Sequence, residues 1–281
     1  MSVYNRAVMH LVESSAVMAA GATVISTDSG EVLQVPKSHR VRSSAITAEG
    51  VSITESDPTL GKVDLDAYKY ASFFQISSEL GTDTDLLGFL AKQAAQSLAF
   101  APHLITGTGT GQPRGLITDA TLGVTGPTGT GTSFGAQTTA GQGTDLLNDL
   151  YSSFAEPYTR SPALAWLMRT PTLGAIRKLK ASTGELVGNA FAGPPSVAGS
   201  QATVLGAPVI LGPSMAAMAH TAKSTVLADL SRYFVRIAGG VQFDRSDDYA
   251  FQSDLISFRC MIRLDAASVD ASSAKYFVHT T

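Results

Sequence analysis

Residues 26–36 read STDSGEVLQVP, and residues 45–65 read AITAEGVSITESDPTLGKVDL. From Lys62 to Ala67, charged and apolar residues alternate, which is the period-2 pattern of a half-exposed strand. With the polar span 52–61 between two such segments, the pattern predicts a long two-stranded hairpin with a loose tip. A lone hairpin is marginally stable in water, so its edges need cover, and a neighbouring subunit is one way to supply it.

After the hairpin comes the clearest helical pattern of the chain, over residues 84–101. Thr82 or Thr84 can serve as its N-cap, and Pro102 marks its end. One face carries the apolar residues at helical spacing: Leu86, Leu87, Leu90, Ala91, Ala94, Ala95 and Leu98. The segment predicts a long rod that another element can approach closely, because half of the stripe is alanine.

The remaining segments mix helices and strands without a regular alternation, which predicts the α+β class. Residues 1–25 are mildly helical and short on anchors, so they favour an extended arm. Two further helices are expected, with Thr144 and Thr170 as caps, Pro171 at the first helical position and Gly184 as the stop. Strands are expected over 163–168, 204–211, 225–230, 251–264 and 274–279, with a hairpin over 234–243 that turns at Gly239-Gly240.

Composition excludes several classes of function. Charged residues make up only 15% of the 281 residues and the net charge is -3, which disfavours a dedicated nucleic-acid binder. The single cysteine, Cys260, lies in an apolar run and predicts a buried, inert thiol, and the five histidines lack metal-ligand spacing. The apolar run 16–25 is too short for a membrane span. We therefore expect no cofactor, no metal and no membrane contact.

Three motifs invite a catalytic interpretation and fail on detail. The stretch GTGTGQPRG, residues 107–115, lacks the Gly-Lys-Ser/Thr of a phosphate loop. A Gly-x-Ser-x-Gly match occurs at residues 131–135 (GTSFG), but it lies within a Gly/Thr-rich loop stretch and not between a strand and a helix, so it does not indicate a nucleophile elbow. The carboxylate pairs Glu49/Glu55 and Asp247/Asp248 fall in a predicted hairpin and a predicted turn, where solvated or interfacial charge is the commoner role. Nothing assembles a catalytic constellation, so we expect a protein that is not an enzyme.

The chain contains, in this order, STDSGEVLQVP (26–36), AITAEGVSITESDPTLGKVDL (45–65), FFQISSELGTD (73–83), GTGTGQPRGLI (107–117), ALAWLMRTPTLGAIRKLKASTGELV (163–187), TVLGAPVILGPSM (203–215) and LADLSRYFVR (227–236). This order of segments carries a resemblance to the Hong Kong 97-type major capsid proteins of tailed bacteriophages. It covers nearly the whole chain from about residue 20. Each motif is weak alone, and their order carries the resemblance.

The resemblance implies a division of the chain. It implies an N-terminal arm (1–26), an extended loop (27–72), a peripheral domain with the spine helix 84–101 and a Gly-rich connector (73–139), an axial domain (140–230) and a return to the peripheral domain (231–281). In the family, axial domains meet around five-fold and six-fold axes, and the extended loop lies over the neighbouring subunit. We expect Glu49, Glu55, Lys62 and Arg114 to make contacts between subunits.

Two departures from the family pattern matter. Many members begin with a scaffolding segment that a phage protease removes, whereas this chain starts at the arm. Either the numbering begins after cleavage or scaffolding is a separate protein, and Met1 favours a separate scaffold or none. Some members also join subunits through an isopeptide bond from a lysine to an asparagine, assisted by a glutamate. Those positions align with Ile53, Asp254 and Met261, so we predict no covalent cross-link.

The implied function is assembly into pentamers and hexamers of an icosahedral shell around double-stranded DNA, made in the bacterial cytoplasm and found in the virion. The DNA would be enclosed without sequence-specific binding, and the other partners would be a portal and possibly scaffold or decoration proteins. Three alternatives remain open: an encapsulin-like cellular nanocompartment, a capsid subunit of a gene transfer agent or prophage remnant, and, from another class, a Ser-dependent hydrolase.

Overall fold

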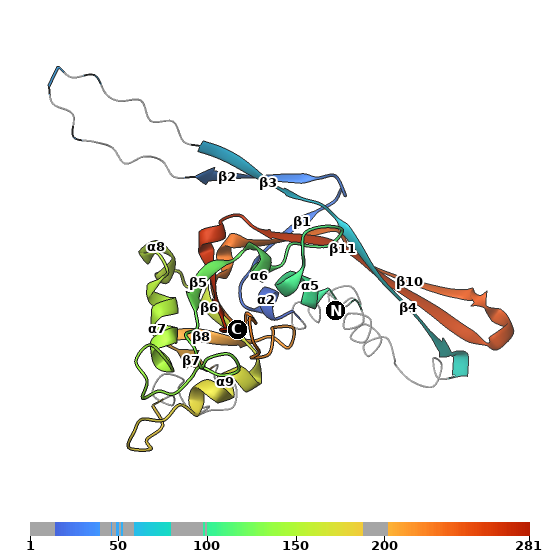
Figure 1. Cartoon of the computed structure of the whole chain (residues 1–281). Coiled ribbons are helices and arrows are strands. Elements are labelled where there is room, and N and C mark those ends of the chain that lie inside the picture. Colours follow the sequence, from blue (N-terminus) through green and yellow to red (C-terminus); the bar gives the residue numbers. More distant parts are fainter. Residues whose placement is uncertain are drawn as a thin grey trace.

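The computed structural model describes residues 15–39, 46, 49–50, 52, 59–79, 98, 100–187 and 202–281. Its strands form a four-stranded sheet in the order β1-β10-β11-β4, a six-stranded sheet in the order β5-β12-β9-β6-β8-β7, and a separate ribbon of β2 and β3. Helices and strands are mixed, as the α+β prediction required. Figure 1 shows the ribbon leaving the body on one side, while β4, β10 and β11 extend on another.

The bounds of the described elements follow the chain. The strands are β1 (Thr23–Thr27), β2 (Leu33–His39), β3 (Thr59–Leu65), β4 (Tyr68–Ser77), β5 (Thr121–Thr125), β6 (Leu164–Met168), β7 (Thr203–Val204), β8 (Ala207–Leu211), β9 (Thr225–Asp229), β10 (Tyr233–Ala250), β11 (Leu255–Ser268) and β12 (Ala274–Val278). The helices are α2 (Ala16–Ala19), α5 (Ala101–Thr106), α6 (Leu116–Asp119), α7 (Thr144–Ser152), α8 (Glu156–Thr159) and α9 (Thr170–Arg177). Short 3-10 turns are η1 (Leu230–Arg232), η2 (Phe251–Ser253) and η3 (Ala271–Ser273).

The four-stranded sheet is built around the long antiparallel pair β10 and β11. The prediction of a hairpin turning at Gly239-Gly240 is wrong, because β10 runs through both glycines as one strand of 18 residues. Both have positive φ, and the register with β11 shifts between Ala238 and Val241, so they form a bulge. Asp247, expected in a turn, therefore lies in a strand, where it pairs with Arg245 at 2.8 Å.

The six-stranded sheet contributes residues to both hydrophobic clusters of the described chain. Every residue of β6 and of β9 is buried, as expected for central strands covered on both faces. Trp166 on β6 is fully buried, and its indole Nε1–H donates to the carbonyl of Val204 at 2.9 Å. Leucines of α7 and α9 pack against the same core. The predicted strand 204–211 is instead the short hairpin β7–β8, turning at Leu205 and Gly206.

The segment after residue 14 is anchored more firmly than the sequence indicates. Val17 and Met18 of α2 are buried in the core, and β1 pairs in parallel with β10, from Thr23 opposite Phe234 to Thr27 opposite Ala238. Residues 1–14 lie outside the described residues. Within 15–27, the expectation of few anchors is therefore corrected, because two apolar side chains and a strand pairing fix this stretch.

Several predicted element ends move by a few residues. Thr144 and Thr170 are the first residues of α7 and α9 and not their caps, which are Gly143 and Arg169. The second of these helices ends at Arg177, well before the expected stop at residue 184. The final long strand begins at Leu255, because the preceding residues form η2.

The predicted spine helix 84–101 falls almost entirely outside the described residues. Pro102, expected to mark its end, stands in the first turn of α5. The domain division stays a prediction. The six-stranded sheet combines strands from both predicted domains. Strands β5 and β12 come from segments predicted as peripheral, and β12 pairs with β5 and with β9 of the predicted axial segment.

Candidate interaction surface

The ribbon of β2 and β3 has one apolar and one polar face. Its register places Leu33 opposite Leu65 and Val35 opposite Val63 on one face, where these side chains are half-buried or buried. Gln34, Pro36, Lys62 and Asp64 occupy the other face and are exposed, with Lys62 and Asp64 paired at 3.6 Å. The predicted alternation is confirmed. An amphipathic ribbon of two strands presents apolar area that the strands alone cannot cover fully.

Within the described residues, β2 and β3 pair only with each other. Each therefore has an edge with backbone N–H and C=O groups that no third described strand satisfies. Figure 1 shows the ribbon projecting from the body, so no other described sheet lies alongside it. Such an element is suited to contact with another molecule.

A buried arginine fixes the root of the ribbon. Arg236 on β10 is 1% exposed, and its Nη1–H donates to the carbonyl of Leu65 at 2.7 Å and of Asp66 at 3.3 Å. Its Nε–H donates to Thr27 Oγ1 at 3.0 Å, and its Nη2–H donates to the Ser29 carbonyl at 2.9 Å. One guanidinium therefore holds both chain segments that enter and leave the ribbon. The planar five-donor fork of arginine suits this role.

A buried carboxylate lies opposite this arginine in the ladder. Asp265 on β11 is the register partner of Arg236, and it accepts from the N–H of Asp66 at 2.6 Å and of Ala266 at 2.7 Å. Burial raises the pKa of the Asp265 carboxyl to about 6. The two backbone hydrogen bonds and the nearby Arg236 charge act in the opposite direction, while the Asp66 carboxylate adds to the rise.

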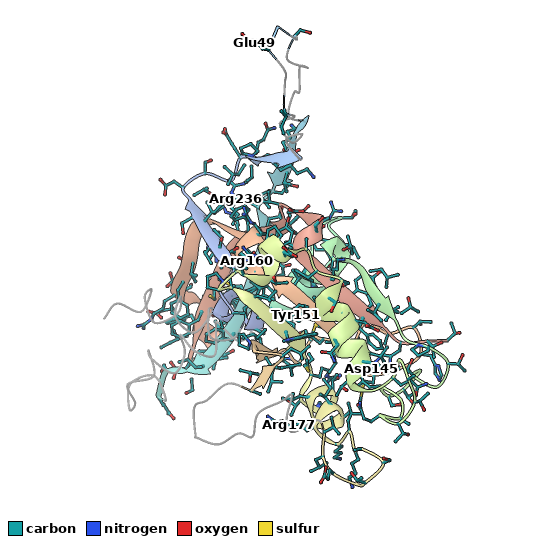
Figure 2. The ribbon with its side chains drawn as sticks, turned by 90° about the vertical axis from the view of Figure 1, so that its left-hand side faces the viewer. Glu49, Asp145, Tyr151, Arg160, Arg177 and Arg236 are labelled. Atoms are coloured by element: carbon teal, nitrogen blue, oxygen red, sulfur yellow. The ribbon has the colours of Figure 1, made fainter. Side chains whose placement is uncertain are left out.

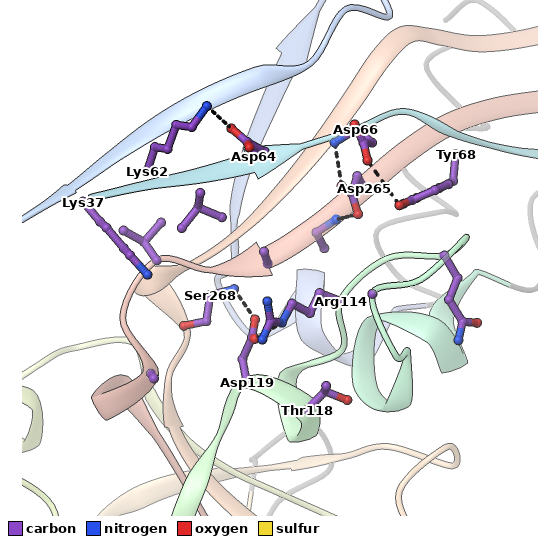
Figure 3. Close-up of a pocket in the computed structure, with 17 residues that line it drawn as sticks. Lys37, Lys62, Asp64, Asp66, Tyr68, Arg114, Thr118, Asp119, Asp265 and Ser268 are labelled. Atoms are coloured by element: carbon purple, nitrogen blue, oxygen red, sulfur yellow. Dashed lines mark hydrogen bonds and ion pairs between the residues drawn. The ribbon is translucent and has the colours of Figure 1, made fainter. Parts of the chain in front are cut away.

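Between the ribbon root and the body lies a cleft of about 400 Å³ (Figure 3). Its charged lining combines three cations with four carboxylates: Lys37, Lys62, Arg114, Asp64, Asp66, Asp119 and Asp265. Arg114 forms an ion pair with Asp119, which also accepts from the N–H of Ser268 at 2.7 Å. Burial raises the pKa of Asp119, against the effects of these partners. Most of these polar groups are thus paired, and the Asp66–Asp265 hydrogen bond joins the ribbon root to β11.

Three of the four predicted contact residues are described, and they fall in two places. Lys62 and Arg114 line the same cleft, although they are far apart in the sequence. Glu49 is exposed at the far end of the hairpin, away from the body (Figure 2). Glu55 lies outside the described residues. Contacts of these residues with another subunit stay a prediction.

The three positions that align with the family cross-link hold residues of other types. Asp254 has φ +49° at the turn between β10 and β11, and both its carboxylate oxygens lie 2.8 Å from the Ser78 hydroxyl. Met261 lies on β11, and Ile53 is outside the described residues. The prediction that no cross-link forms is not tested by these positions alone.

The Gly-rich motif folds as a tight structural loop. The Tyr233 hydroxyl is buried beneath it, 2.9 Å from the Leu104 carbonyl and 2.8 Å from the Arg114 carbonyl. A Cβ atom on Gly107 would lie 2.1 Å from the Pro113 carbonyl oxygen, so a glycine is required where the two loop ends meet. The residue pattern that suggested a phosphate loop has this packing role in the structure.

A serine and a histidine meet in the core in a way that bears on the hydrolase alternative. The Nδ1 atom of His279 lies 2.6 Å from the Thr130 carbonyl and must donate to it, which leaves Nε2 to accept from the Ser224 hydroxyl at 2.7 Å. This is the hydrogen-bond order of a catalytic dyad. Both side chains are buried, at 0% and 1% exposure, and neither lines a described cleft, so a substrate has no access to the hydroxyl.

The remaining features of the sequence are the cysteine, possible metal ligands and possible membrane helices. Cys260 is buried, as predicted, and burial raises the pKa of its thiol to about 11, which disfavours the reactive thiolate. In the described part of the chain, no three His, Cys, Asp or Glu side chains gather as metal ligands would. No helix among the described residues has the length and apolar character to cross a membrane.

Sequence reasoning missed the two residues that hold the ribbon root. Arg236 and Asp265 each interrupt an apolar strand segment, in YFVRIAGG (233–240) and MIRLDAAS (261–268). A charged residue in a buried strand is the available signal, since buried charges require partners. The partners, however, come from segments more than 150 residues away, which the sequence pattern does not reveal.

Comparison with known proteins gives one family and a set of similar folds. The model of the family described as "Phage capsid family" matches residues 4–278. The structure titled "Capsid of native GTA particle computed with C5 symmetry" is similar with a TM-score of 0.78 and 20% identity, covering 95% of this chain and 90% of that chain. A structure from Mycobacterium phage Bobi has a TM-score of 0.70 and 14% identity, covering 95% of this chain and 91% of that chain. No curated protein matches the chain significantly.

Proposed function

Because this chain belongs to the phage capsid family, we propose that copies of it assemble as pentamers and hexamers into an icosahedral shell that encloses the double-stranded DNA of a tailed phage. The chain is a capsid protein, and its fold is the Hong Kong 97-type capsid fold predicted from the order of its motifs. The arrangement of the subunits, the enclosed DNA and any portal, scaffold or decoration partners belong to the proposal.

The observation that carries the proposal is the projecting ribbon of β2 and β3. It has an apolar face and two edges that no other described strand pairs with, and a buried arginine holds its root. A ribbon that is anchored at one end and projects from the body gains hydrogen-bond partners and buries apolar area when another molecule packs on it. Copies of one chain that repeat the same contact around a closed ring supply that cover to every ribbon.

Assembly gains strength from repetition. Each contact can be modest, because every subunit makes several contacts at once and leaves the lattice only when all are broken. The net charge of -3 suits a container for DNA, since a weakly acidic wall does not hold the genome strongly. Charged residues make up only 15% of the chain, which is consistent with a surface that other copies largely cover.

Electron microscopy of the purified protein and of its native particle tests the proposal. We expect closed shells with five-fold vertices, and nuclease-protected double-stranded DNA in the native particle. Shells that contain enzymes in place of DNA would favour the nanocompartment alternative. A compact monomer or dimer at all concentrations would overturn the proposal of assembly.

A further inference from the structure

Two cations lie side by side on the exposed face of the four-stranded sheet. Lys69 on β4 and Arg263 on β11 are register partners, so their side chains leave the sheet on the same face. Neither has a hydrogen bond or an ion pair with the described chain. Like charges directly opposite each other in a β-ladder repel, so this pair lowers the stability of the isolated subunit.

The guanidinium of Arg263 sits in a notch that glycines keep open. A Cβ atom on Gly30 would lie 2.7 Å from its Nη1, and a Cβ atom on Gly239 would lie 2.9 Å from its Nη2. Arg263 also lines a cleft of about 420 Å³ together with Lys69, Gln242 and neighbouring residues. An arginine with open donors beside a lysine and a glutamine amide provides the groups that bind a carboxylate.

The size of the positive patch distinguishes between anions. Arg259 lies on the same face of β11, four residues along, but it is already paired with Asp244 at 2.8 Å. The uncompensated charge on this face of the described strands is thus concentrated at Lys69 and Arg263. A nucleic-acid backbone needs an extended basic stripe to bind well, whereas one carboxylate needs only such a pair.

A complementary charge is present elsewhere on the same chain. Between Arg42 and Lys62 the sequence has three acidic residues, Glu49, Glu55 and Asp57, and no Lys or Arg. Glu49 is exposed at the far end of the hairpin (Figure 2). Lys69 lies just beyond the root of that hairpin, four residues after the end of β3. Seven-residue strands of about 3.3 Å per residue separate the two ends by more than 20 Å, so the two charges can meet only between copies.

We propose that Lys69 and Arg263 receive the Glu49 carboxylate of a second copy, so that the end of each hairpin docks on the exposed sheet face of its neighbour. The inference rests on the proposed assembly of copies into a shell. It adds a specific charge contact, whose function is to set the register of the hairpin on its neighbour. Interfacial charge pairs of this kind fix orientation and suppress wrong pairings.

Charge reversal on both sides tests the pairing. We expect Arg263→Glu alone and Glu49→Arg alone to lower the yield of closed particles about tenfold at a fixed subunit concentration. The double variant, Arg263→Glu with Glu49→Arg, should recover to within about threefold of the wild type, because the charges are exchanged and not lost. Particle yield is measured by sedimentation and electron microscopy.

Two further variants distinguish loss of this contact from misfolding of the subunit. Lys69→Glu changes an exposed side chain and should reproduce the loss seen with Arg263→Glu. Arg245→Glu is the matched control, because it lies on the same sheet in an exposed pair with Asp247 and leaves the two cations in place. Its particle yield should stay within about twofold of the wild type.

The outcomes separate the two proposals. If the wild type assembles and the single reversals do not change its yield, or the double variant is worse than both, the pairing is wrong while the shell function stands. If the reversals leave particle yield unchanged but lower the retained DNA, the patch binds nucleic acid and the pairing is overturned. A wild type that never assembles overturns both.

Discussion

The Nη1 atom of Arg236 lies 2.7 Å from the carbonyl oxygen of Leu65, although 171 residues separate the two in the chain. The same side chain reaches the Ser29 carbonyl on the incoming segment. The root of the projecting ribbon is therefore held by a polar network around one side chain. Because the network is buried, each backbone group in it depends on that guanidinium for its partner.

Replacing this arginine should release the ribbon root. We expect Arg236→Met to lower the free energy of unfolding by about 3–5 kcal/mol, since an apolar side chain of similar length leaves buried acceptors unsatisfied. Urea denaturation of the unassembled subunit measures the loss. Arg245→Met, which removes only an exposed pair, is the control and should cost less than about 1 kcal/mol. Equal effects of the two changes would contradict the role given to Arg236.

The buried carboxyl beside that arginine predicts a pH dependence. The folded-state pKa of Asp265 is raised from 3.8 to about 6, so the folded state binds a proton more tightly than the unfolded chain. Stability from this group therefore increases as the pH falls through 6, by about 1.4 kcal/mol between pH 7.5 and pH 5.

Asp265→Asn isolates that contribution. The amide cannot ionise, so the difference in unfolding free energy between the wild type and the variant should shift by about 1.4 kcal/mol in favour of the wild type over the same pH interval. The amide also accepts only one of the two backbone N–H groups that bond to the carboxylate, which lowers stability at every pH. A difference that stays constant with pH would contradict the raised pKa.

The ribbon shows how far a residue pattern predicts this fold. The alternation around Val63 and Leu65 predicts a hairpin with two faces because a strand directs successive side chains to opposite sides. At Gly239-Gly240 the same type of reasoning fails. Two glycines with positive φ suit a tight turn, but pairing with β11 on both sides of them makes them a bulge in a continuous strand.

The candidate surface was predicted only in part, for a related reason. Lys62 and Arg114 were expected at contacts from the resemblance, and the structure places both in one cleft. Arg236 and Asp265 were not predicted, because their importance comes from backbone groups brought to them by distant segments. Local sequence patterns describe which face a residue takes, whereas such contacts depend on the tertiary arrangement.

The buried serine–histidine pair gives a direct test of the hydrolase alternative. We expect no labelling of Ser224 by an activated phosphonate reagent, since its hydroxyl is fully buried and already donates to His279. Mass spectrometry of the treated protein measures the modification, with a known serine hydrolase treated in parallel. Stoichiometric labelling at Ser224 would return the hydrolase alternative to consideration.

Covalent joining of subunits is also open to a simple measurement. Because Ile53, Asp254 and Met261 stand where the family's cross-linking lysine, asparagine and glutamate align, the groups that form an isopeptide bond are missing from those positions. We expect particles boiled in denaturant to release a single monomer band on a gel. A ladder of covalent multimers would show that other residues provide the bond.

The apolar face of the ribbon should be the face that another subunit covers. Val35 is half-buried opposite Val63 and does not line the cleft at the ribbon root, and a carboxylate there would be desolvated once a neighbour packs on it. We expect Val35→Asp to lower particle yield at least about tenfold while the melting temperature of the unassembled subunit changes little, because the ribbon lies outside both large sheets. Gln34→Asp, on the exposed polar face, is the matched control and should assemble normally. If the effects are reversed, so that the change at Gln34 blocks assembly and the change at Val35 does not, the polar face is the contact surface and the orientation argued for the ribbon is wrong.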